Sequence, residues 1–195
     1  GNYNNNEQSY VESPCFDFSL LTNPFLDFYY WIYTYEDYDG AQIQYTIDGV
    51  TWHTIGDVNY PPNPSGWYNI DYIQGLSFTG NTIGWSSAGF NWLYTEHPLE
   101  FLAGEPFVKF RFVWGSDGSY NYYDGFAFDD FSIFEPPLQT WSSTTVEQSE
   151  LLITSPGMTN QRVLRIGVEM NSSTNPLAVT RFDCNTTGSS SSADI

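Results

Sequence analysis

The chain is poor in positive charge. Lys and Arg together number five against 23 Asp and Glu, which gives a formal net charge of −18 over 195 residues. Because phosphate binding needs clustered cations and a negative field repels polyanions, we expect no nucleic acid as a partner and no binding to an anionic membrane surface. The same charge favours cations such as Ca²⁺ and leaves a neutral polysaccharide open as a ligand. The alternative is that the charge serves solubility alone.

Cysteines and long apolar runs are also scarce. The two cysteines, Cys15 and Cys184, lie far apart in the sequence, a pattern that excludes a disulfide scaffold and a cysteine metal site. We expect each to be a small buried apolar residue. No segment is long and apolar enough to span a membrane, so we expect no direct membrane insertion.

Helical periodicity is the third feature that the sequence lacks, since no long window repeats its apolar residues every 3.6 positions. Aromatic residues make up 19% of the chain, enough to build a sizeable core and typical of strands. Short alternating runs are separated by Gly, Pro, Asn and Asp. Together these patterns predict an all-β fold.

One β-hairpin is well marked. Residues 41–47 alternate between apolar and polar side chains, with Gln42 and Gln44 on the polar face. The Asp-Gly pair at 48–49 is a strong turn signal, and residues 51–55 form the natural return strand.

Other strands are expected where apolar residues are denser. The aromatic run at residues 24–35 predicts a central strand buried on both faces. Residues 107–114 alternate, with Lys109 and Arg111 opposite the aromatic side chains, and residues 126–134 predict the last strand of this set. Residues 57–97 have weak periodicity, so we expect one or two irregular strands within long loops there.

A domain boundary is expected at Glu135-Pro-Pro137, because two consecutive prolines cannot continue a β-ladder. Beyond it aromatic residues thin out while Ser and Thr become frequent, and residues 161–170 and 177–182 predict further strands. The sequence therefore predicts a first domain at 1–136 and a partial β-sandwich module at 138–195, with the apolar side chains of 161–170 facing inward.

Several segments carry a family resemblance. Asp124-Gly-Phe-Ala-Phe-Asp-Asp-Phe-Ser-Ile133 resembles the closing strand of MAM-type jelly-roll domains, and Tyr10-Val-Glu-Ser-Pro-Cys-Phe-Asp-Phe-Ser19 resembles their opening strand. The hairpin at 39–49, followed by Thr51 and Trp52, matches the same class. The resemblance covers about residues 3–135 in order, and in bacteria such domains occur in secreted and surface proteins, often of Bacteroidetes.

The second segment has its own likeness. Gln161-Arg-Val-Leu-Arg-Ile166 and the stretch that follows are similar to part of a module near the N-terminus of BNR-repeat sialidase-like proteins. The two resemblances imply a MAM-like jelly-roll β-sandwich followed by a second, partial β-sandwich module. They imply adhesion or substrate tethering and no catalytic residue.

A structural Ca²⁺ site is predicted around Asp129 and Asp130, on oxygen-ligand chemistry and on the resemblance. Adjacent strand residues point to opposite faces, so one carboxylate must face inward or toward a sheet edge, where it needs a metal or many hydrogen bonds. The alternatives are carboxylates that cap backbone N–H groups and, for the acidic turn at 37–39, a solvated hairpin. The candidate ligands are Asp129, Asp130, Asp17, Glu12, Asp39 and Asp37.

Aromatic residues in the expected loops form a candidate ligand-binding surface, because sugar rings stack on flat aromatic faces. The alternative for each is a role in the core. The candidates are Trp67, Tyr68, Trp85, Trp92, Tyr94, Tyr120, Tyr122 and Tyr123.

No catalytic motif is recognisable. The chain has two histidines, His53 and His97, and neither stands in a hydrolase or metalloprotease pattern. We therefore expect a non-catalytic, extracellular adhesion or glycan-binding module of a larger secreted or cell-surface protein, with a glycan, a cell-surface protein or other modules or chains of that protein as partners. The alternative is an accessory or spacer region of a secreted hydrolase, sialidase-like or peptidase, with little binding of its own.

Overall fold

The computed structural model describes residues 2–58, 67–87, 89, 91–137, 139–147, 164–171 and 179–183. Contacts between Cα atoms divide the chain into two compact units, Gly1–Pro136 and Pro137–Ile195, and the division falls within the Pro136-Pro137 pair. Cys184 lies outside the described residues. The described residues 179–183 contain no strand.

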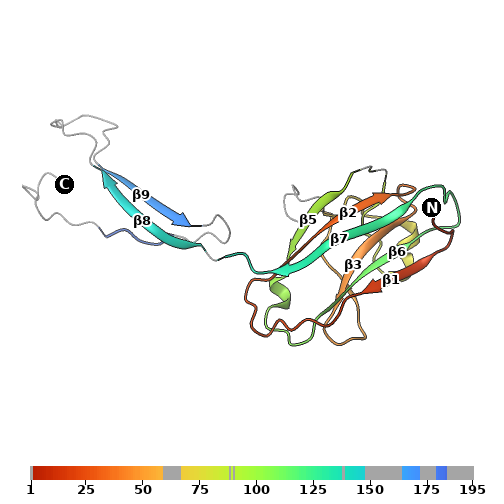
Figure 1. Ribbon diagram of the computed structural model, residues 1–195, viewed down its shortest axis with the longest axis horizontal. Coiled ribbons are helices and arrows are strands. Elements are labelled where there is room, and N and C mark those ends of the chain that lie inside the picture. The colour runs from red at the N-terminus through yellow and green to blue at the C-terminus, as the bar shows by residue number, and fades with distance from the viewer. Residues whose placement is uncertain are drawn as a thin grey trace, which may run out of the picture. The chain divides into compact units, whose positions relative to one another are not determined.

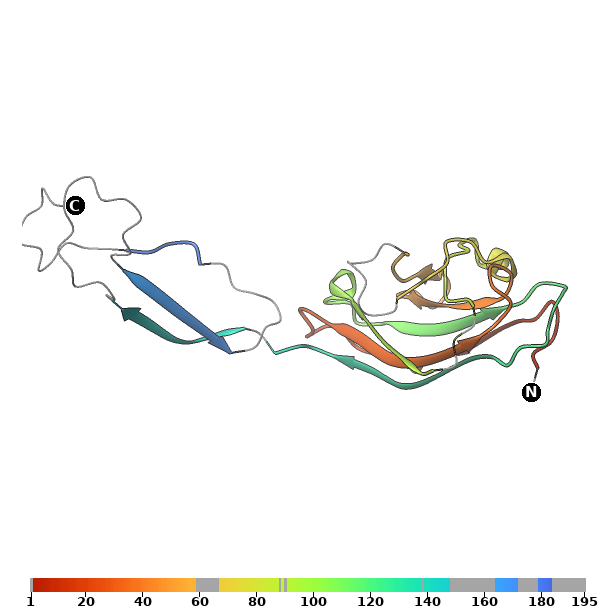
Figure 2. The same ribbon diagram turned by 90° about the horizontal axis from the view of Figure 1, so that it is seen from above.

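Unit 1 is all-β, as predicted, and consists of two antiparallel sheets that form two layers (Figures 1 and 2). The four-stranded sheet has the order β1 (Gln8–Glu12), β6 (Lys109–Gly115), β3 (Gly40–Thr46) and β4 (His53–Thr54). The three-stranded sheet has the order β5 (Leu93–Pro98), β2 (Phe25–Tyr33) and β7 (Gly125–Phe134). Two 3₁₀-helices, η1 (Gln74–Thr79) and η2 (Glu100–Leu102), complete its elements. The jelly-roll connectivity stays a prediction.

The core lies between the two sheets and is largely aromatic. Phe28 of β2 packs edge to face on Phe112 of β6, with ring centroids 4.9 Å apart, and on Trp85 at 5.6 Å. Trp85 and Trp67 are themselves buried, at 0% and 1% exposure. Edge-to-face ring pairs add to the hydrophobic stabilisation, so this cluster fixes the spacing of the layers.

Strand β2 is central in its sheet, as predicted, but the prediction that both of its faces are buried is wrong. Its even-numbered residues, such as Phe28 and Tyr30, face the core, whereas Tyr29 on the other face is 42% exposed. Successive residues of this strand face the core and the solvent in turn, although most residues on both faces are aromatic or aliphatic. The residue types alone therefore did not show that one face is exposed.

Strand β3 shows the reverse arrangement. Its polar residues Gln42 and Gln44 are 0% and 1% exposed, although they lie on the face away from the core. Segment 67–87, which includes η1, covers that face of the four-stranded sheet (Figure 2). Gln42 Nε2 donates to the carbonyl oxygens of Asn81 and Ile83 at 2.8 and 3.1 Å, so its burial leaves no donor unsatisfied.

The expected hairpin is confirmed, since β3 pairs with β4 in antiparallel register. Asp48 holds its turn: Oδ1 accepts hydrogen bonds from the backbone N–H groups of Val50 and Thr51 at 2.8 and 2.7 Å. Gly49 has φ of 74°, the left-handed conformation that this turn requires. The strands expected at 107–114 and 126–134 are confirmed as β6 and β7.

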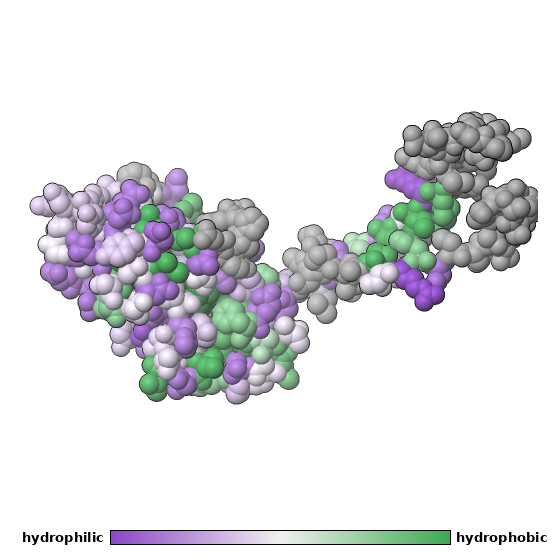
Figure 3. All heavy atoms as spheres, turned by 180° about the vertical axis from the view of Figure 1, so that it is seen from behind, coloured by the Kyte–Doolittle hydropathy of each residue, from purple (hydrophilic) through white to green (hydrophobic). Residues whose placement is uncertain are grey.

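Unit 2, within its described residues, contains one hairpin of β8 (Thr140–Glu147) and β9 (Arg165–Asn171). Hydrophobic residues gather on the face of this hairpin seen in Figure 3. The inward packing expected for the apolar side chains of 161–170 is wrong for Leu164 and Val168, which are 47% and 37% exposed. No second layer packs on the hairpin among the described residues of unit 2.

In the described part of the chain, no helix has the length and apolar character needed to cross a membrane.

Candidate functional site

A band of aromatic side chains lies on the outer face of the three-stranded sheet. We call it the aromatic strip. It is formed by residues that share the outward direction of Tyr29 along β2, by one residue of β5 and the residue just before that strand, and by one residue of the loop before β7. Its members are Tyr29, Trp31, Tyr33, Trp92, Tyr94 and Tyr123.

Alternation along the strands positions these rings. Tyr29 pairs with Tyr94 across β2 and β5, with ring centroids 5.4 Å apart. Trp31 and Tyr33 follow on the same face, with ring centroids 6.4 Å apart. Tyr123 packs edge to face on Tyr33 at 4.9 Å. Trp92 stands just before the first residue of β5, and it is 50% exposed.

Small residues on β7 leave one side of the strip open. Trp31 stands opposite Ala127, and Tyr33 stands opposite Gly125. Neither partner carries a side chain large enough to cover an indole or phenol ring, so the rings keep accessible flat surface on that side of the sheet.

Carboxylates border the strip at its Tyr94 end. The Tyr94 hydroxyl lies within hydrogen-bonding distance of Glu96 Oε2 at 2.9 Å and of Asp27 Oδ2 at 3.2 Å. Asp27 also accepts a hydrogen bond from Ser132 of β7. Partial burial, together with these two carboxylates, raises the pKa of Tyr94 well above its usual value, so this phenol stays a hydrogen-bond donor at physiological pH.

Further tyrosines continue the aromatic surface beyond the strand ends. Tyr35 stacks on Tyr38 at 4.6 Å and contacts Tyr120 at 4.9 Å and Tyr123 at 6.3 Å. Tyr120 is 59% exposed. The strip is therefore continuous with a tyrosine cluster in the adjoining loops.

The sequence correctly singled out part of this surface. The exposed candidates are Trp92, Tyr94, Tyr120 and Tyr122, and Tyr123 is half-buried. Tyr94 lies in β5, although a loop was expected there.

Three aromatic candidates cannot contact a ligand at the surface, and their inclusion was wrong. Trp67, Tyr68 and Trp85 are at most 1% exposed. Trp67 Nε1 donates to Ile55 O at 3.2 Å, and the Tyr68 hydroxyl bonds both backbone groups of Ile43. These polar contacts make large rings compatible with the core, which is the alternative that the sequence left open.

The aromatic residues of β2 were missed. Tyr29, Trp31 and Tyr33 were assigned to a strand buried on both faces, so no exposed surface was expected there. The odd-numbered and the even-numbered residues of the strand are both mainly apolar, whereas a three-stranded sheet in a two-layer fold packs against only one other layer. That mismatch was the signal that one set of apolar residues is exposed.

Neither Asp129 nor Asp130 faces inward, because a β-bulge interrupts β7 there; the other expected position, a sheet edge, is the one that β7 occupies. Tyr29 pairs with Asp129 and Asp27 with Ser132, so β7 has one residue more than β2 between these pairs. Asp130 adopts the left-handed conformation, with φ of 54°, and its N–H donates to Asp129 Oδ1 at 2.8 Å. The bulge resets the alternation, and both carboxylates are exposed.

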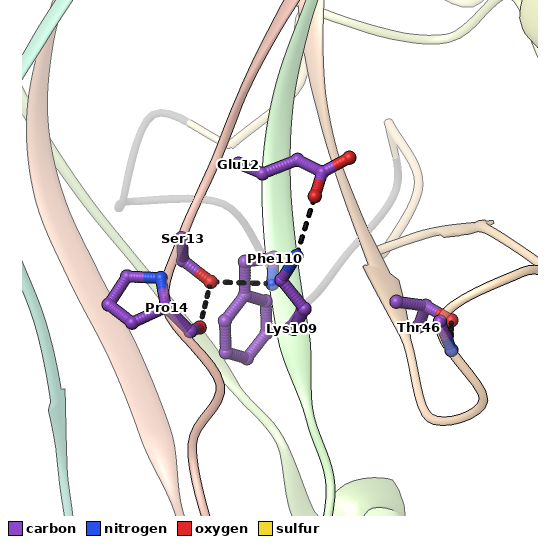
Figure 4. A network of polar contacts seen from close by, with 7 residues as sticks. Glu12, Ser13, Pro14, Thr46, Lys109 and Phe110 are labelled. Atoms are coloured by element: carbon purple, nitrogen blue, oxygen red, sulfur yellow. Dashed lines mark hydrogen bonds and ion pairs between the residues drawn. The ribbon is translucent and has the colours of Figure 1, made fainter.

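Two of the other predicted metal ligands, Asp17 and Glu12, have partners of their own. Asp17 accepts from the backbone N–H and hydroxyl of Ser19 at 2.9 and 2.6 Å, and Glu12 pairs with Lys109 at 2.6 Å (Figure 4). Asp37 lies exposed in its turn.

Asp39 is fully buried, so the solvated-hairpin alternative is wrong for it. Its carboxylate accepts from the Tyr3 hydroxyl at 2.5 Å and from Asp117 N at 2.7 Å. Burial raises its pKa above the usual range for a carboxyl.

Ca²⁺ binding stays a prediction, and the chosen ligands do not converge on one point. No three His, Cys, Asp or Glu side chains within the described ranges are grouped in a way that could hold a metal ion. Cys15 is exposed, so the expectation that it is buried was wrong. It stands just before Phe16, whose backbone bonds Val108.

No protein-family model matches the chain, and comparison with curated proteins finds no significant match. The MAM-type resemblance and the likeness to sialidase-associated modules therefore stay predictions.

Proposed function

We propose that unit 1 is a non-catalytic adhesion module of a larger secreted or cell-surface protein, and that the aromatic strip binds a neutral glycan. The observation that carries the proposal is the exposed aromatic face of β2. Surface rings of this size cost solubility unless they have a partner, and contiguous exposed patches of this kind are typical of binding sites.

The chemistry of the strip suits a carbohydrate. The C–H faces of pyranose rings pack on flat aromatic rings, and Trp and Tyr offer that area with few rotatable bonds. Asp27, Glu96 and the Tyr94 hydroxyl supply acceptors and a donor for sugar hydroxyl groups at one end of the strip.

Charge restricts the ligand further. Residues 1–136 contain 18 Asp and Glu against two Lys and Arg, a formal charge of −16. Sulfated or uronic-acid polysaccharides would be repelled by this field, so the proposed ligand is a neutral glycan presented on a cell surface.

Affinity electrophoresis in gels containing neutral polysaccharides, together with a glycan array, tests the proposal. Trp31→Ala should weaken binding about five- to thirtyfold, since ring stacking contributes on the order of 1–2 kcal/mol. Trp52→Ala is the matched control, because Trp52 is also half-buried but contacts Arg111 of the other sheet. Absence of binding to every neutral glycan would overturn the proposal and favour the spacer alternative.

A further inference from the structure

The sandwich is open along one side, where two edge strands face each other. Strand β7 pairs with β2, and β1 pairs with β6, but no strand in the described ranges pairs with the other edge of either. An unpaired edge presents a row of backbone N–H and C=O groups that can pair with another chain.

A groove lies between these edges. Two adjoining cavities form it, of about 420 and 350 Å³, and both are lined by Val11, Phe112 and Phe128. The larger one extends along β7 from Gly125 to Phe128, and the smaller continues past Pro14 to Phe131. Its walls are mainly apolar, so the groove can bury alternate side chains of an extended segment.

The two ends of β7 differ in how well they are protected. The bulge at Asp130, with the charge of that residue, obstructs strand addition from Asp130 onward, in the C-terminal half of β7. Gly125-Phe-Ala-Phe128 has no bulge and no charge, and it borders the larger cavity. The unprotected half of the edge thus coincides with the roomier half of the groove.

The wall formed by β1 is held firmly. Backbone pairing with β6 continues past the end of β1, where Ser13 N donates to Phe110 O and Phe110 N donates to Ser13 Oγ, both at 2.9 Å (Figure 4). Glu12 and Lys109 pair across the same two strands. The groove therefore has one wall fixed in place before any segment enters.

Charge indicates what could enter. Glu7, Glu12 and Arg111 line the groove, Glu12 is paired with Lys109, and Asp129 and Asp130 are exposed on its β7 side, so acidic groups outnumber basic groups four to two there. Two copies of a unit with formal charge −16 repel each other, which disfavours edge-to-edge pairing of this chain with itself. A segment bearing Lys or Arg on its outward positions is electrostatically complementary.

We propose that the Gly125–Asp129 edge of β7 accepts an extended basic peptide segment of a partner protein as an added β-strand. Small apolar residues of the segment fill the groove beside Phe112 and Phe128, and alternating Lys or Arg residues face outward. This site differs from the aromatic strip and does not depend on the glycan proposal.

The probe is a labelled peptide of about eight residues in which Val alternates with Lys and Thr, titrated into the full chain by fluorescence anisotropy. We expect saturable binding that falls with added salt. The same peptide with Glu in place of Lys should bind at least about tenfold more weakly. Equal binding of both peptides would overturn the proposed chemistry.

Substitutions locate the site. Val11 lines both cavities and is 60% exposed, so Val11→Lys should weaken binding about tenfold or more without unfolding the chain. Val50→Lys is the matched control, since Val50 is 81% exposed in the turn after Gly49, and it should bind as the parent does. Trp31→Ala should also leave peptide binding unchanged, which separates this site from the glycan site.

Hydrogen exchange identifies the edge. Bound peptide should slow amide exchange within residues 125–129, whereas slowing confined to residues 8–12 would place the added strand on β1 and overturn the assignment to β7. A dimer of the free chain that Val11→Lys abolishes would mean that a second copy fills the groove, and would likewise overturn the proposal.

Discussion

Strands β2 and β3 lie at the centres of their sheets and invert the usual link between polarity and burial. Strand β2 carries aromatic residues on both faces, yet Tyr29 is 42% exposed. Strand β3 carries glutamines, yet Gln42 is 0% exposed. The difference arises from what covers each outer face: segment 67–87 lies over β3, and no described element lies over the outer face of β2.

The contrast between β2 and β3 distinguishes residues that are explained by folding from residues that are better explained by a ligand. A buried polar residue is tolerated when its hydrogen bonds are complete, so the glutamines of β3 serve folding. An exposed row of rings contributes little to folding, and its presence on β2 is better explained by a ligand. Measurements that compare the two faces of each strand test this interpretation.

The largest effect is expected on the inner face of β2. Phe28→Ala removes a ring that contacts Phe112, Trp67 and Trp85, and should lower the free energy of unfolding by about 4 kcal/mol. Tyr29→Ala, one residue along on the outer face, should cost less than about 1 kcal/mol. Urea denaturation followed by tryptophan fluorescence measures both. Similar losses for the two variants would contradict the assignment of the outer face to binding.

The buried amide of Gln42 comes next. Its Oε1 accepts from Gln44 Nε2 at 2.7 Å and Thr54 Oγ1 at 3.0 Å, while its Nε2 donates to two carbonyls of segment 67–87. Gln42→Ala removes this partner from Gln44 Nε2, Thr54 Oγ1 and Ile83 O, whereas Asn81 O still accepts from Thr79 Oγ1, and the substitution should cost about 3 kcal/mol in urea denaturation. Gln8→Ala on the exposed edge strand β1 is the control, with a change below about 0.5 kcal/mol. Equal stability of the two variants would mean that the cover over β3 opens readily.

Local sequence patterns were sufficient to predict the strands, but they did not predict which segments cover the faces of those strands. The hairpin at Asp48 and the strand β6 were predicted because turn chemistry and alternation act within a few residues. Burial of Gln42 depends on Asn81 and Ile83, which lie some forty positions away in a segment with weak periodicity.

The candidate site was anticipated only in part, for a related reason. Alternation alone cannot tell which face of β2 lies on the core when both sets of residues are apolar. The inward position considered for one of Asp129 and Asp130 was wrong because it assumed a regular strand, and the bulge at Asp130 is set by pairing with β2. Trp67 and Trp85 were assigned to loops, but their rings fill the space between the sheets.

The pH dependence of stability probes the inner face of the sheet that contains β2. His97 of β5 pairs with Leu26 of β2 and is 4% exposed, and burial lowers its pKa to about 4. Between pH 6.5 and pH 4, His97 is protonated in the unfolded chain but neutral in the folded chain. The free energy of unfolding therefore falls by up to about 3 kcal/mol as the pH is lowered through this range.

Thermal melts across this range should show that loss, and a His97→Gln variant should lack most of it. Asp39 acts in the opposite direction because its pKa is raised: the folded chain protonates first as pH falls. The difference between parent and variant therefore isolates His97. If the parent and the variant lose stability in parallel as the pH falls, water reaches the imidazole. The inner face of this sheet would then be less well shielded from water than the covered face of β3.

The smallest effect on stability is expected on the polar face of β3, at the border of the area that segment 67–87 covers. Gln44 Oε1 accepts from Arg111 Nε at 2.8 Å, and the Arg111 guanidinium lies over the rings of Trp52 and Tyr10, with its central carbon 4.1 and 5.2 Å from their centroids. Arg111→Lys keeps the charge but loses the planar stacking and the Nε donor, and should cost about 1 kcal/mol. Salt distinguishes the causes: because the charge is retained, the loss should be the same in dilute and in concentrated NaCl. Absence of any loss would mean that the guanidinium stabilises β3 mainly through its charge, which Lys retains, whereas a salt-independent loss means that β3 is stabilised by the planar stacking and the Nε hydrogen bond.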